Sequence, residues 1–291
     1  MFMTEEGLST VRGSPLTSCE SWDSHSVEIR RPDREMPYLK YSIRGILGAI
    51  VSLLTILSCT PPVETLTVEV LSVRPHDPSA YTQGLLLHDR MLYESTGRYG
   101  ESTLRRVDPY TGEVVRQISL PEAYFGEGLA RRSDRLVQLT YREGIAFVYG
   151  IEDFGPLGQF SYQGQGWGLC YDGEHFLMSN GSATLTVRDP ATFEVIDQIH
   201  VTRNGSPVLR LNELECVGNE VYANVYLTDR IVKIEKETGK VITEIDASGL
   251  LTPMERLRAD VLNGIAHDPE TGSFLITGKL WPKLFEVRFV P

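Results

Sequence analysis

The chain has 291 residues, of which 41% are hydrophobic, 23% charged and 9% aromatic, a composition typical of a folded globular protein rather than of a disordered or multispanning membrane protein. Its 28 basic and 39 acidic side chains give a formal net charge of −11, and the basic residues form no dense run, so nucleic acid is not expected as a partner. The four cysteines show neither a Cys-x-x-Cys pair nor histidines at zinc-ligand spacing, so we expect neither a disulfide scaffold nor metal catalysis through Cys or His ligands.

An apolar segment near the N-terminus has the form of a lipoprotein signal peptide. About a dozen nearly continuous apolar residues, 46–57, follow Lys40 and Arg44, whereas a transmembrane helix needs about 20. Residues 56–59 read Ile-Leu-Ser-Cys and resemble a bacterial lipobox, which predicts that Cys59 carries the lipid anchor. The alternative is a buried helix followed by an ordinary cysteine.

The position of this segment determines the expected domain boundaries. Because a signal peptide begins at the N-terminus, and Met36 directly precedes a basic segment, we interpret residues 1–35 as a non-native extension or a disordered segment. Residues 36–58 are then the lipoprotein-type signal peptide, 59–63 a tether and 64–291 the folded domain. We expect an exported protein, held by the lipid anchor on the periplasmic or extracytoplasmic face of a membrane.

The remaining chain contains five repeats, each marked by a tripeptide that begins an expected strand. The tripeptides are Gln83-Gly84-Leu85, Glu127-Gly128-Leu129, Trp167-Gly168-Leu169, Asn212-Glu213-Leu214 and Asn263-Gly264-Ile265. Their leading positions are 44, 40, 45 and 51 residues apart, a spacing typical of four-stranded propeller blades.

Further β-rich segments follow each tripeptide. Second strands are expected at 91–95, 136–140, 176–179, 221–225 and 274–277, third strands at 103–107, 145–149, 184–188, 230–234 and 284–288, and fourth strands at 113–120, 194–201 and 240–245. The fifth repeat lacks a fourth strand, which the orphan strand at 66–73 can supply. The sequence therefore predicts an all-β, five-bladed β-propeller whose last blade is completed by the N-terminal strand, with 253–258 as the candidate helix.

The first strand of each propeller blade lies beside the central axis, so the five leading residues are expected to converge at one mouth of the channel. These residues are Gln83, Glu127, Trp167, Asn212 and Asn263. Four polar side chains and one indole would form a polar cup with an aromatic wall, as a small-ligand site requires. The alternative is an interaction propeller with a water-filled polar axis.

Six motifs in register resemble the glutaminyl cyclases of the plant and bacterial type. They are Tyr81-Thr82-Gln83-Gly84-Leu85, Phe125-Gly126-Glu127-Gly128-Leu129, Gly166-Trp167-Gly168-Leu169, Leu211-Asn212-Glu213-Leu214-Glu215, Leu262-Asn263-Gly264-Ile265-Ala266 and Thr277-Gly278-Lys279-Leu280-Trp281-Pro282. The resemblance implies a five-bladed propeller that converts the N-terminal glutamine of peptides or proteins to pyroglutamate and releases ammonia. It implies a glutaminyl-peptide cyclotransferase, an acyltransferase without catalytic zinc.

The resemblance also implies roles for individual residues. Glu127 falls at the position of the catalytic glutamate, which moves a proton between the two nitrogens. Asn212 and Lys279 are expected to stabilise the carboxamide oxygen as negative charge develops. Gln83 would bind the substrate by hydrogen bonds, and Trp167 would form the apolar wall.

Further substrate-binding residues are expected around this set. Tyr141 and Tyr226 stand where plant-type enzymes tend to carry tryptophan, which keeps a flat face but leaves substrate preference open. Phe125 and Tyr81 are expected at the rim, and Asn263 completes the binding set.

The expected partners are peptides or proteins with an N-terminal glutamine, and the membrane through the lipid anchor. We expect a monomer, no cofactor in catalysis and no catalytic metal, while a structural calcium ion in the channel stays compatible with the sequence. Two other functions stay open: a propeller that binds peptide termini or sugars without turnover, and a calcium-dependent lactonase-type propeller, in which Glu127, Asn212 and Asn263 would supply part of the ligand set.

Cys170 and Cys216 are expected to be packed thiols. Cys170 stands three positions after Trp167 and Cys216 four after Asn212, so strand alternation points the two side chains to opposite faces of adjacent blades.

Overall fold

The computed structural model describes residues 62–291. The expected signal peptide, the extension 1–35 and the lipid anchor at Cys59 lie outside the described residues. Within residues 62–291 no helix is long and apolar enough to cross a membrane.

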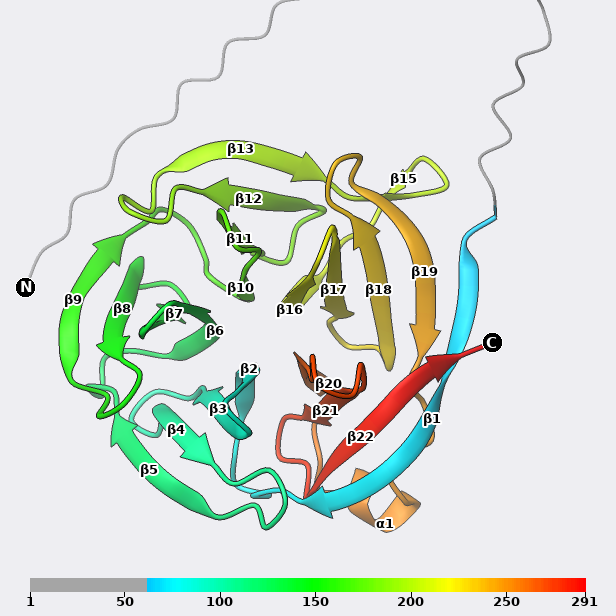
Figure 1. The fold of residues 1–291 in the computed structure, drawn as a ribbon, viewed down its shortest axis with the longest axis horizontal. Helices are drawn as coiled ribbons and strands as arrows, with labels where there is room; N and C mark the ends of the chain where they lie inside the picture. The colour runs from blue at the N-terminus through cyan, green and yellow to red at the C-terminus, as the bar shows by residue number, and fades with distance from the viewer. Residues whose placement is uncertain (1–61) are drawn as a thin grey trace, which may run out of the picture. The chain divides into compact units, whose positions relative to one another are not determined.

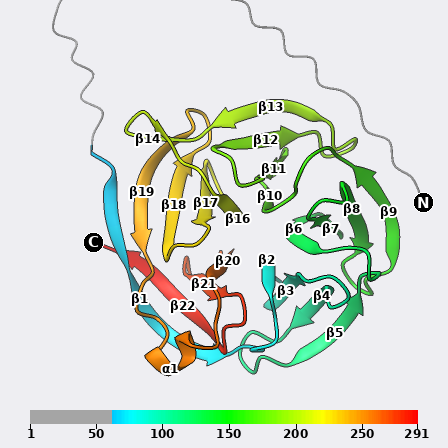
Figure 2. The ribbon, with the colours of Figure 1, turned by 180° about the vertical axis from the view of Figure 1, so that it is seen from behind.

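The described residues form an all-β, propeller-like fold, in which sheets are arranged around a central axis (Figures 1 and 2). The first sheet contains β2 (Thr82–His88), β3 (Met91–Thr96), β4 (Thr103–Val107) and β5 (Val114–Ser119). The second contains β6 (Gly126–Arg132), β7 (Arg135–Thr140), β8 (Ile145–Gly150) and β9 (Pro156–Ser161). The third contains β10 (Leu169–Tyr171), β11 (Phe176–Met178), β12 (Thr184–Arg188) and β13 (Val195–His200).

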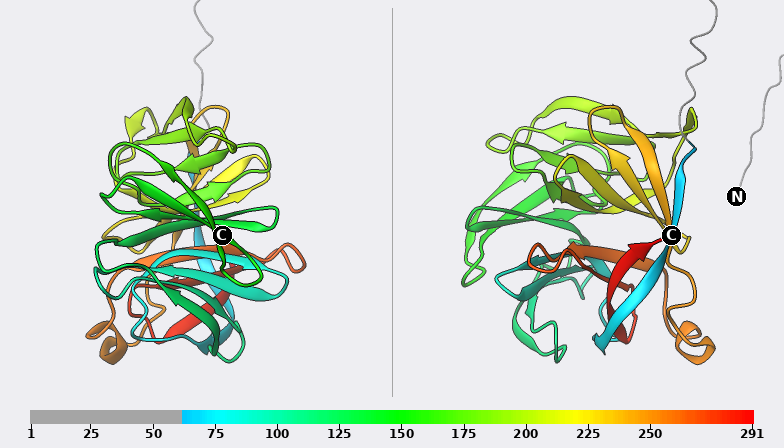
Figure 3. Two further views of the ribbon diagram at one scale, coloured as in Figure 1. Left: turned by 90° about the vertical axis from the view of Figure 1, so that its left-hand side faces the viewer. Right: turned by 45° about the vertical axis from the view of Figure 1, so that its right-hand side comes forward.

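A ten-stranded sheet completes the ring. Its strands are β16 (Leu211–Val217), β17 (Glu220–Val225), β18 (Arg230–Glu235), β19 (Lys240–Asp246), β1 (Glu64–Pro75), β22 (Lys283–Val290), β21 (Phe274–Gly278) and β20 (Leu262–His267), with β14 (Thr202–Arg203) and β15 (Ser206–Pro207) as a hairpin beside β19. The helix α1 (Pro253–Arg256) lies outside the ring, beyond β22 and β1 (Figures 1 and 3).

The N-terminal strand β1 closes the ring. It pairs antiparallel with β22, as the sequence predicts, with Val68 opposite Phe289. It also pairs in parallel with β19, with Leu66 opposite Ile245, which the sequence does not predict. Because β1 joins strands from the last two repeats, the two ends of the described chain are tied together by backbone hydrogen bonds (Figure 1).

Apolar cores fill the spaces between neighbouring sheets. Leu177 and Leu185 of the third sheet pack with Leu214 and Val232 of the next repeat, and the same arrangement recurs around the ring. The inner strands of each sheet are therefore largely buried on both faces, whereas the outermost strands, such as β5, β9 and β13, are mostly exposed.

Close approach of the inner strands explains the repeated glycine of the tripeptides. A Cβ at Gly84 would lie 2.5 Å from the Leu129 nitrogen, and a Cβ at Gly128 would lie 2.5 Å from the Leu169 nitrogen. In the fourth repeat Glu213 takes this place, and its carboxylate accepts hydrogen bonds from the backbone N–H groups of Leu85 and Ile265 at 3.3 and 2.8 Å. One acidic side chain thus joins the inner strands of three repeats.

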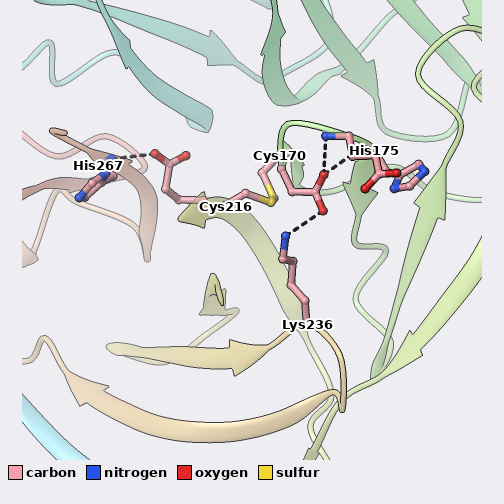
Figure 4. The surroundings of a disulfide bond; sticks show 8 residues. Cys170, His175, Cys216, Lys236 and His267 are labelled. Carbon is pink, nitrogen blue, oxygen red and sulfur yellow. Dashed lines mark hydrogen bonds and ion pairs between the residues drawn. A yellow bond between two sulfur atoms is a disulfide. The ribbon is translucent and has the colours of Figure 1, made fainter. Parts of the chain in front are cut away.

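The expectation that Cys170 and Cys216 are free thiols is wrong, because the two form a disulfide with a Cα–Cα distance of 5.6 Å (Figure 4). Alternation does place them on opposite faces of their sheets. In a ring of sheets, however, one face of a sheet packs against the opposite face of the next, so these are the faces that meet. The bond joins β10 to β16.

The disulfide should contribute measurably to stability. We expect the Cys170→Ala/Cys216→Ala double variant to lose about 2–4 kcal/mol in the free energy of unfolding, because the bond closes a loop over a sequence separation of 46 residues. The corresponding fall in Tm is roughly 5–15 °C. Reduction should lower the Tm of the wild type and leave the variant unchanged, which separates the bond from the lost side-chain volume. Two alkylatable thiols at these positions in the native protein would contradict the prediction.

Candidate active site

Nine side chains line one small cavity at an end of the central axis. They are Tyr81, Gln83, Phe125, Glu127, Tyr141, Trp167, Asn212, Tyr226 and Lys279. All of them lie at or near strand ends. Three belong to the inner strands β2, β6 and β16, and the others come shortly before or after a strand, with at least one from every repeat. The cavity volume is about 190 Å³, below the roughly 300–1,000 Å³ of pockets for drug-sized ligands, so it suits a single amino-acid residue.

Glu127 is the acidic side chain in the cavity wall. It is 4% exposed, and its carboxyl group makes no hydrogen bond to any residue in 62–291. Burial raises the pKa of this carboxyl well above its usual range; Lys279 opposes that shift and Glu143 adds to it. A carboxyl group with a raised pKa and unused hydrogen-bonding capacity is suited to accept and return a proton near neutral pH.

Lys279 supplies a buried positive charge to the same cavity. Its side chain is nearly covered, and Nζ lies 4.9 Å from the Tyr81 ring centre and 5.2 Å from that of Tyr226. Burial lowers the pKa of the ammonium group, while Glu127 and Asp260 oppose this shift. The backbone of Lys279 is fixed, since its N–H donates to the Val261 carbonyl at 2.9 Å. The ammonium is therefore held by aromatic faces, with no carboxylate within 4.0 Å among the described residues.

Two amide side chains complete the polar part of the wall. Gln83 and Asn212 are 3% and 2% exposed. The Gln83 Oε1 atom is buried and has no hydrogen-bond partner in the described part of the chain. Leaving such an atom unpaired costs free energy, and because Gln83 lines the cavity, its amide oxygen is a candidate acceptor for a hydrogen bond from a ligand.

Aromatic rings form the rest of the wall. Trp167 meets Tyr226 edge to face, with ring centres 5.5 Å apart, and Phe125 lies 5.8 Å from Tyr141. The Trp167 indole also covers Gly181, where a Cβ would come within 2.6 Å of the ring. The sequence does not predict a role for Gly181, which leaves room for the indole because it has no side chain. These rings exclude water from one side of the polar groups.

Asn263 is the one predicted binding residue that the structure does not place in the cavity wall. Its Nδ2 donates to the backbone carbonyl of Thr82 at 3.0 Å, so it holds β2 next to Gln83. The residue is fully buried. Of the three candidate ligands for a lactonase-type calcium site, only Glu127 and Asn212 share the cavity.

Two further acidic side chains, Glu213 and Glu215, lie on the inner strand β16 but do not line the cavity. Residues 62–291 contain no group of three or more His, Cys, Asp or Glu side chains arranged to hold a metal ion. Glu213, which is buried, and Glu215, which is half-buried, both accept backbone N–H bonds, in the case of Glu215 from His267 at 2.8 Å (Figure 4). Burial raises the pKa of Glu215 to about 8.

Comparison with known proteins decides the family. The family model described as glutamine cyclotransferase matches residues 47–289. The chain belongs to this family. A curated glutaminyl-peptide cyclotransferase from Arabidopsis thaliana is 41% identical over 227 residues, which are 76% of this chain and 71% of the plant protein. The crystal structure of Myxococcus xanthus glutaminyl cyclase superposes with a TM-score of 0.72 at 37% identity, covering 79% of this chain and 99% of that one. The resemblance seen in the six motifs is thereby confirmed.

Proposed function

We propose that this member of the glutamine cyclotransferase family converts the N-terminal glutamine of peptides or proteins to pyroglutamate and releases ammonia. The observation that carries the proposal is the buried Glu127 carboxyl, which shares a cavity of single-residue size with Lys279 and the two amides. The family match and both relatives support the same reaction.

The cavity groups account for each step of the reaction. The substrate's α-amine attacks the carbon of its own side-chain carboxamide, and Glu127 as carboxylate accepts the proton that the amine loses. Lys279 and the Asn212 amide stabilise the oxyanion that forms on the carboxamide oxygen. Glu127 then donates the proton to the carboxamide nitrogen, the carbon–nitrogen bond breaks and ammonia leaves. The carboxylate is regenerated, so no net proton is taken up.

The remaining residues orient the substrate. Gln83 accepts a hydrogen bond from a substrate N–H, while Trp167, Tyr226 and Tyr141 press the glutamine side chain toward its own amine. Because the bound glutamine is held in one folded rotamer, the entropy of restricting its side chain is lost on binding and not at the step in which the ring closes. Phe125 and Tyr81 close the rim.

Ammonia release tests the proposal directly. A Gln-initiated dipeptide amide should yield one ammonia per peptide and a product 17 Da lighter, because the reaction eliminates NH₃. The matching Asn-initiated dipeptide serves as control, because its shorter side chain would have to close a four-membered ring. Binding of the glutamine peptide without ammonia release would favour a non-catalytic binding module.

We expect catalysis to be independent of metal ions, since Glu127 and Lys279 together supply the proton transfer and the charge stabilisation. Dialysis against a strong chelator should leave kcat within about twofold of its initial value. Loss of an essential acid–base group would instead lower it by 10²–10⁴-fold. Loss of turnover that zinc or calcium alone restores would contradict this prediction. The same chelator experiment separates the proposal from a calcium-dependent lactonase.

We also propose that the protein is exported and anchored by a lipid on Cys59. The apolar segment 46–57, the lipobox-like residues 56–59 and the Pro61-Pro62 tether support this. Mass spectrometry of the native protein should find an acylated Cys59 at the N-terminus, and Cys59→Ala should abolish that modification. A soluble, unlipidated chain that retains residues 1–35 would contradict both the anchor and a start at Met36. We propose further that the folded unit is a monomer, which a molar-mass measurement by light scattering can test.

We propose that the ring be counted as five blades. Dividing the ten-stranded sheet where β1 meets β19 yields β16 to β19 and the group β1, β22, β21 and β20, which join the three four-stranded sheets. Five apolar cores between neighbouring groups support this count.

A further inference from the structure

Two exposed arginines are stacked on tyrosines that line the cavity. The Arg98 Cζ lies 4.8 Å from the centre of the Tyr81 ring, and the Arg142 Cζ lies 4.5 Å from that of Tyr141. Each arginine closely follows the second strand of its sheet, β3 or β7. Neither arginine lines the cavity itself, but each is exposed and stacks on a tyrosine of its wall, so we place both guanidinium groups beside its mouth.

Phe125 connects these two stacked pairs. Its ring centre lies 6.3 Å from that of Tyr81 and 5.8 Å from that of Tyr141, and Tyr99 packs on it at 5.4 Å. Tyr99 is 53% exposed, so aromatic surface continues from the cavity to the solvent. We call Arg98, Tyr99 and Arg142 the outer rim.

Both guanidinium groups keep N–H donors free. Arg142 donates to the Tyr141 hydroxyl at 3.0 Å and forms no ion pair with a described residue, although Glu143 is adjacent. The Glu143 carboxylate instead accepts from the Tyr99 hydroxyl at 2.8 Å. The ion pair of Arg98 with Glu101 is 3.8 Å long and exposed, which is too long for a hydrogen bond.

The charge of the rest of the molecule makes this arrangement distinctive. Residues 59–291 contain 22 basic and 32 acidic side chains, a net charge of −10, which repels acidic peptides on average. Stacking on a ring restrains a guanidinium and lowers the entropy lost when it binds a carboxylate. Two restrained guanidiniums at the mouth therefore offer acidic side chains a local site on an otherwise acidic protein.

The size of the cavity determines which part of a substrate meets the outer rim. A volume of about 190 Å³ holds the glutamine residue, so the next residues leave through the mouth. An extended chain advances about 3.3–3.6 Å per residue. The second and third residues consequently reach guanidinium groups that lie less than 5 Å from rings of the cavity wall.

We propose that Arg98 and Arg142 form an outer subsite that binds an acidic side chain of the second or third substrate residue, so that the enzyme prefers peptides in which acidic residues follow the N-terminal glutamine. This inference rests on the proposed function and adds its substrate class. Carboxylate and guanidinium meet through charge-assisted hydrogen bonds, which are stronger than neutral ones.

The test compares two peptides of equal shape, Gln-Glu-Glu-Gly-amide and Gln-Gln-Gln-Gly-amide; only the first residue of each has the free amine that cyclisation needs. At low salt the wild type should show a kcat/KM about threefold to tenfold higher for the acidic peptide, mainly through a lower KM. The ratio should approach one in Arg98→Gln/Arg142→Gln. About 0.5 M salt should reduce the wild-type ratio, because it screens exposed charges.

A matched control removes two arginines elsewhere. Arg116 on β5 and Arg288 on β22 are exposed and lie outside the cavity, so Arg116→Gln/Arg288→Gln changes the net charge equally and should keep the wild-type ratio. No preference in the wild type, or an equal ratio in wild type and rim variant, overturns the inference. A loss of preference in both double variants also overturns it, because net charge would then be the cause. Absence of ammonia from both peptides would instead contradict the proposed function.

Discussion

Replacing Glu127 by Gln should reduce cyclisation by 10²–10⁴-fold, the usual contribution of a general acid–base group. The amide keeps the shape of the carboxyl but carries no transferable proton, so the α-amine cannot be deprotonated within the cavity. The measurement is kcat for ammonia release from a Gln-initiated peptide. The wild-type kcat/KM should fall at acidic pH as Glu127 becomes protonated, at a pH above the usual carboxyl range because burial raises its pKa. In the residual activity of the variant, only the limb due to the substrate's own α-amine, whose pKa is about 7.7–8.0 in model peptides, should remain.

The same substitution should not destabilise the fold at neutral or alkaline pH. A carboxyl whose pKa is raised on folding binds its proton more tightly in the folded state, so the wild type loses stability as pH rises from the unfolded pKa to the folded one. The Gln variant lacks that loss, and its Tm at pH 8 should equal or exceed that of the wild type. Glu122→Gln, an exposed neighbour, is the matched control and should keep full activity. Activity of Glu127→Gln within about threefold of the wild type would remove Glu127 from the mechanism.

The order of strands could be predicted because each repeat carries its own signals. The glycine that follows the leading residue is required by contact with the next inner strand, as the Cβ distances at Gly84 and Gly128 show, so it recurs at the blade spacing. The orphan strand at 66–73 was assigned by counting, since the last repeat lacked a partner. The additional parallel pairing with β19 involves the start of β1, Glu64–Thr67, which precedes most of the part that pairs with β22. No repeat of the sequence indicates this second pairing.

The cavity wall could be predicted largely through the family resemblance, and what was missed depends on contacts between repeats. Asn263 has the same place in its motif as Gln83, yet its amide is used on the Thr82 carbonyl. The disulfide was missed because alternation was judged within single sheets, while the bond lies between two. Glu143 and Gly181 lie in connections between strands, where the sequence has no periodicity that places a side chain.

The second large effect is expected for Lys279→Met, which should lower kcat by about 10²–10³-fold, as the loss of one oxyanion donor does elsewhere. Methionine has similar length and suits the aromatic faces of Tyr81 and Tyr226, so the fold should survive. Lys240→Met removes an exposed lysine of β19 and serves as control; its kcat should not change.

The pH profile distinguishes a catalytic role of Lys279 from a purely structural one. Its ammonium lowers the pKa of Glu127, so its removal should raise that pKa further and move the acidic limb of kcat/KM to higher pH. A lysine that only supported the cavity wall would change the rate without this shift. Lys279→Arg retains the charge and should keep the limb near its wild-type position, even if its larger head group displaces the substrate and lowers kcat. An acidic limb at the same pH in wild type and Lys279→Met would show that the charge does not act on Glu127, and kcat within about threefold of the wild type would remove Lys279 from oxyanion stabilisation.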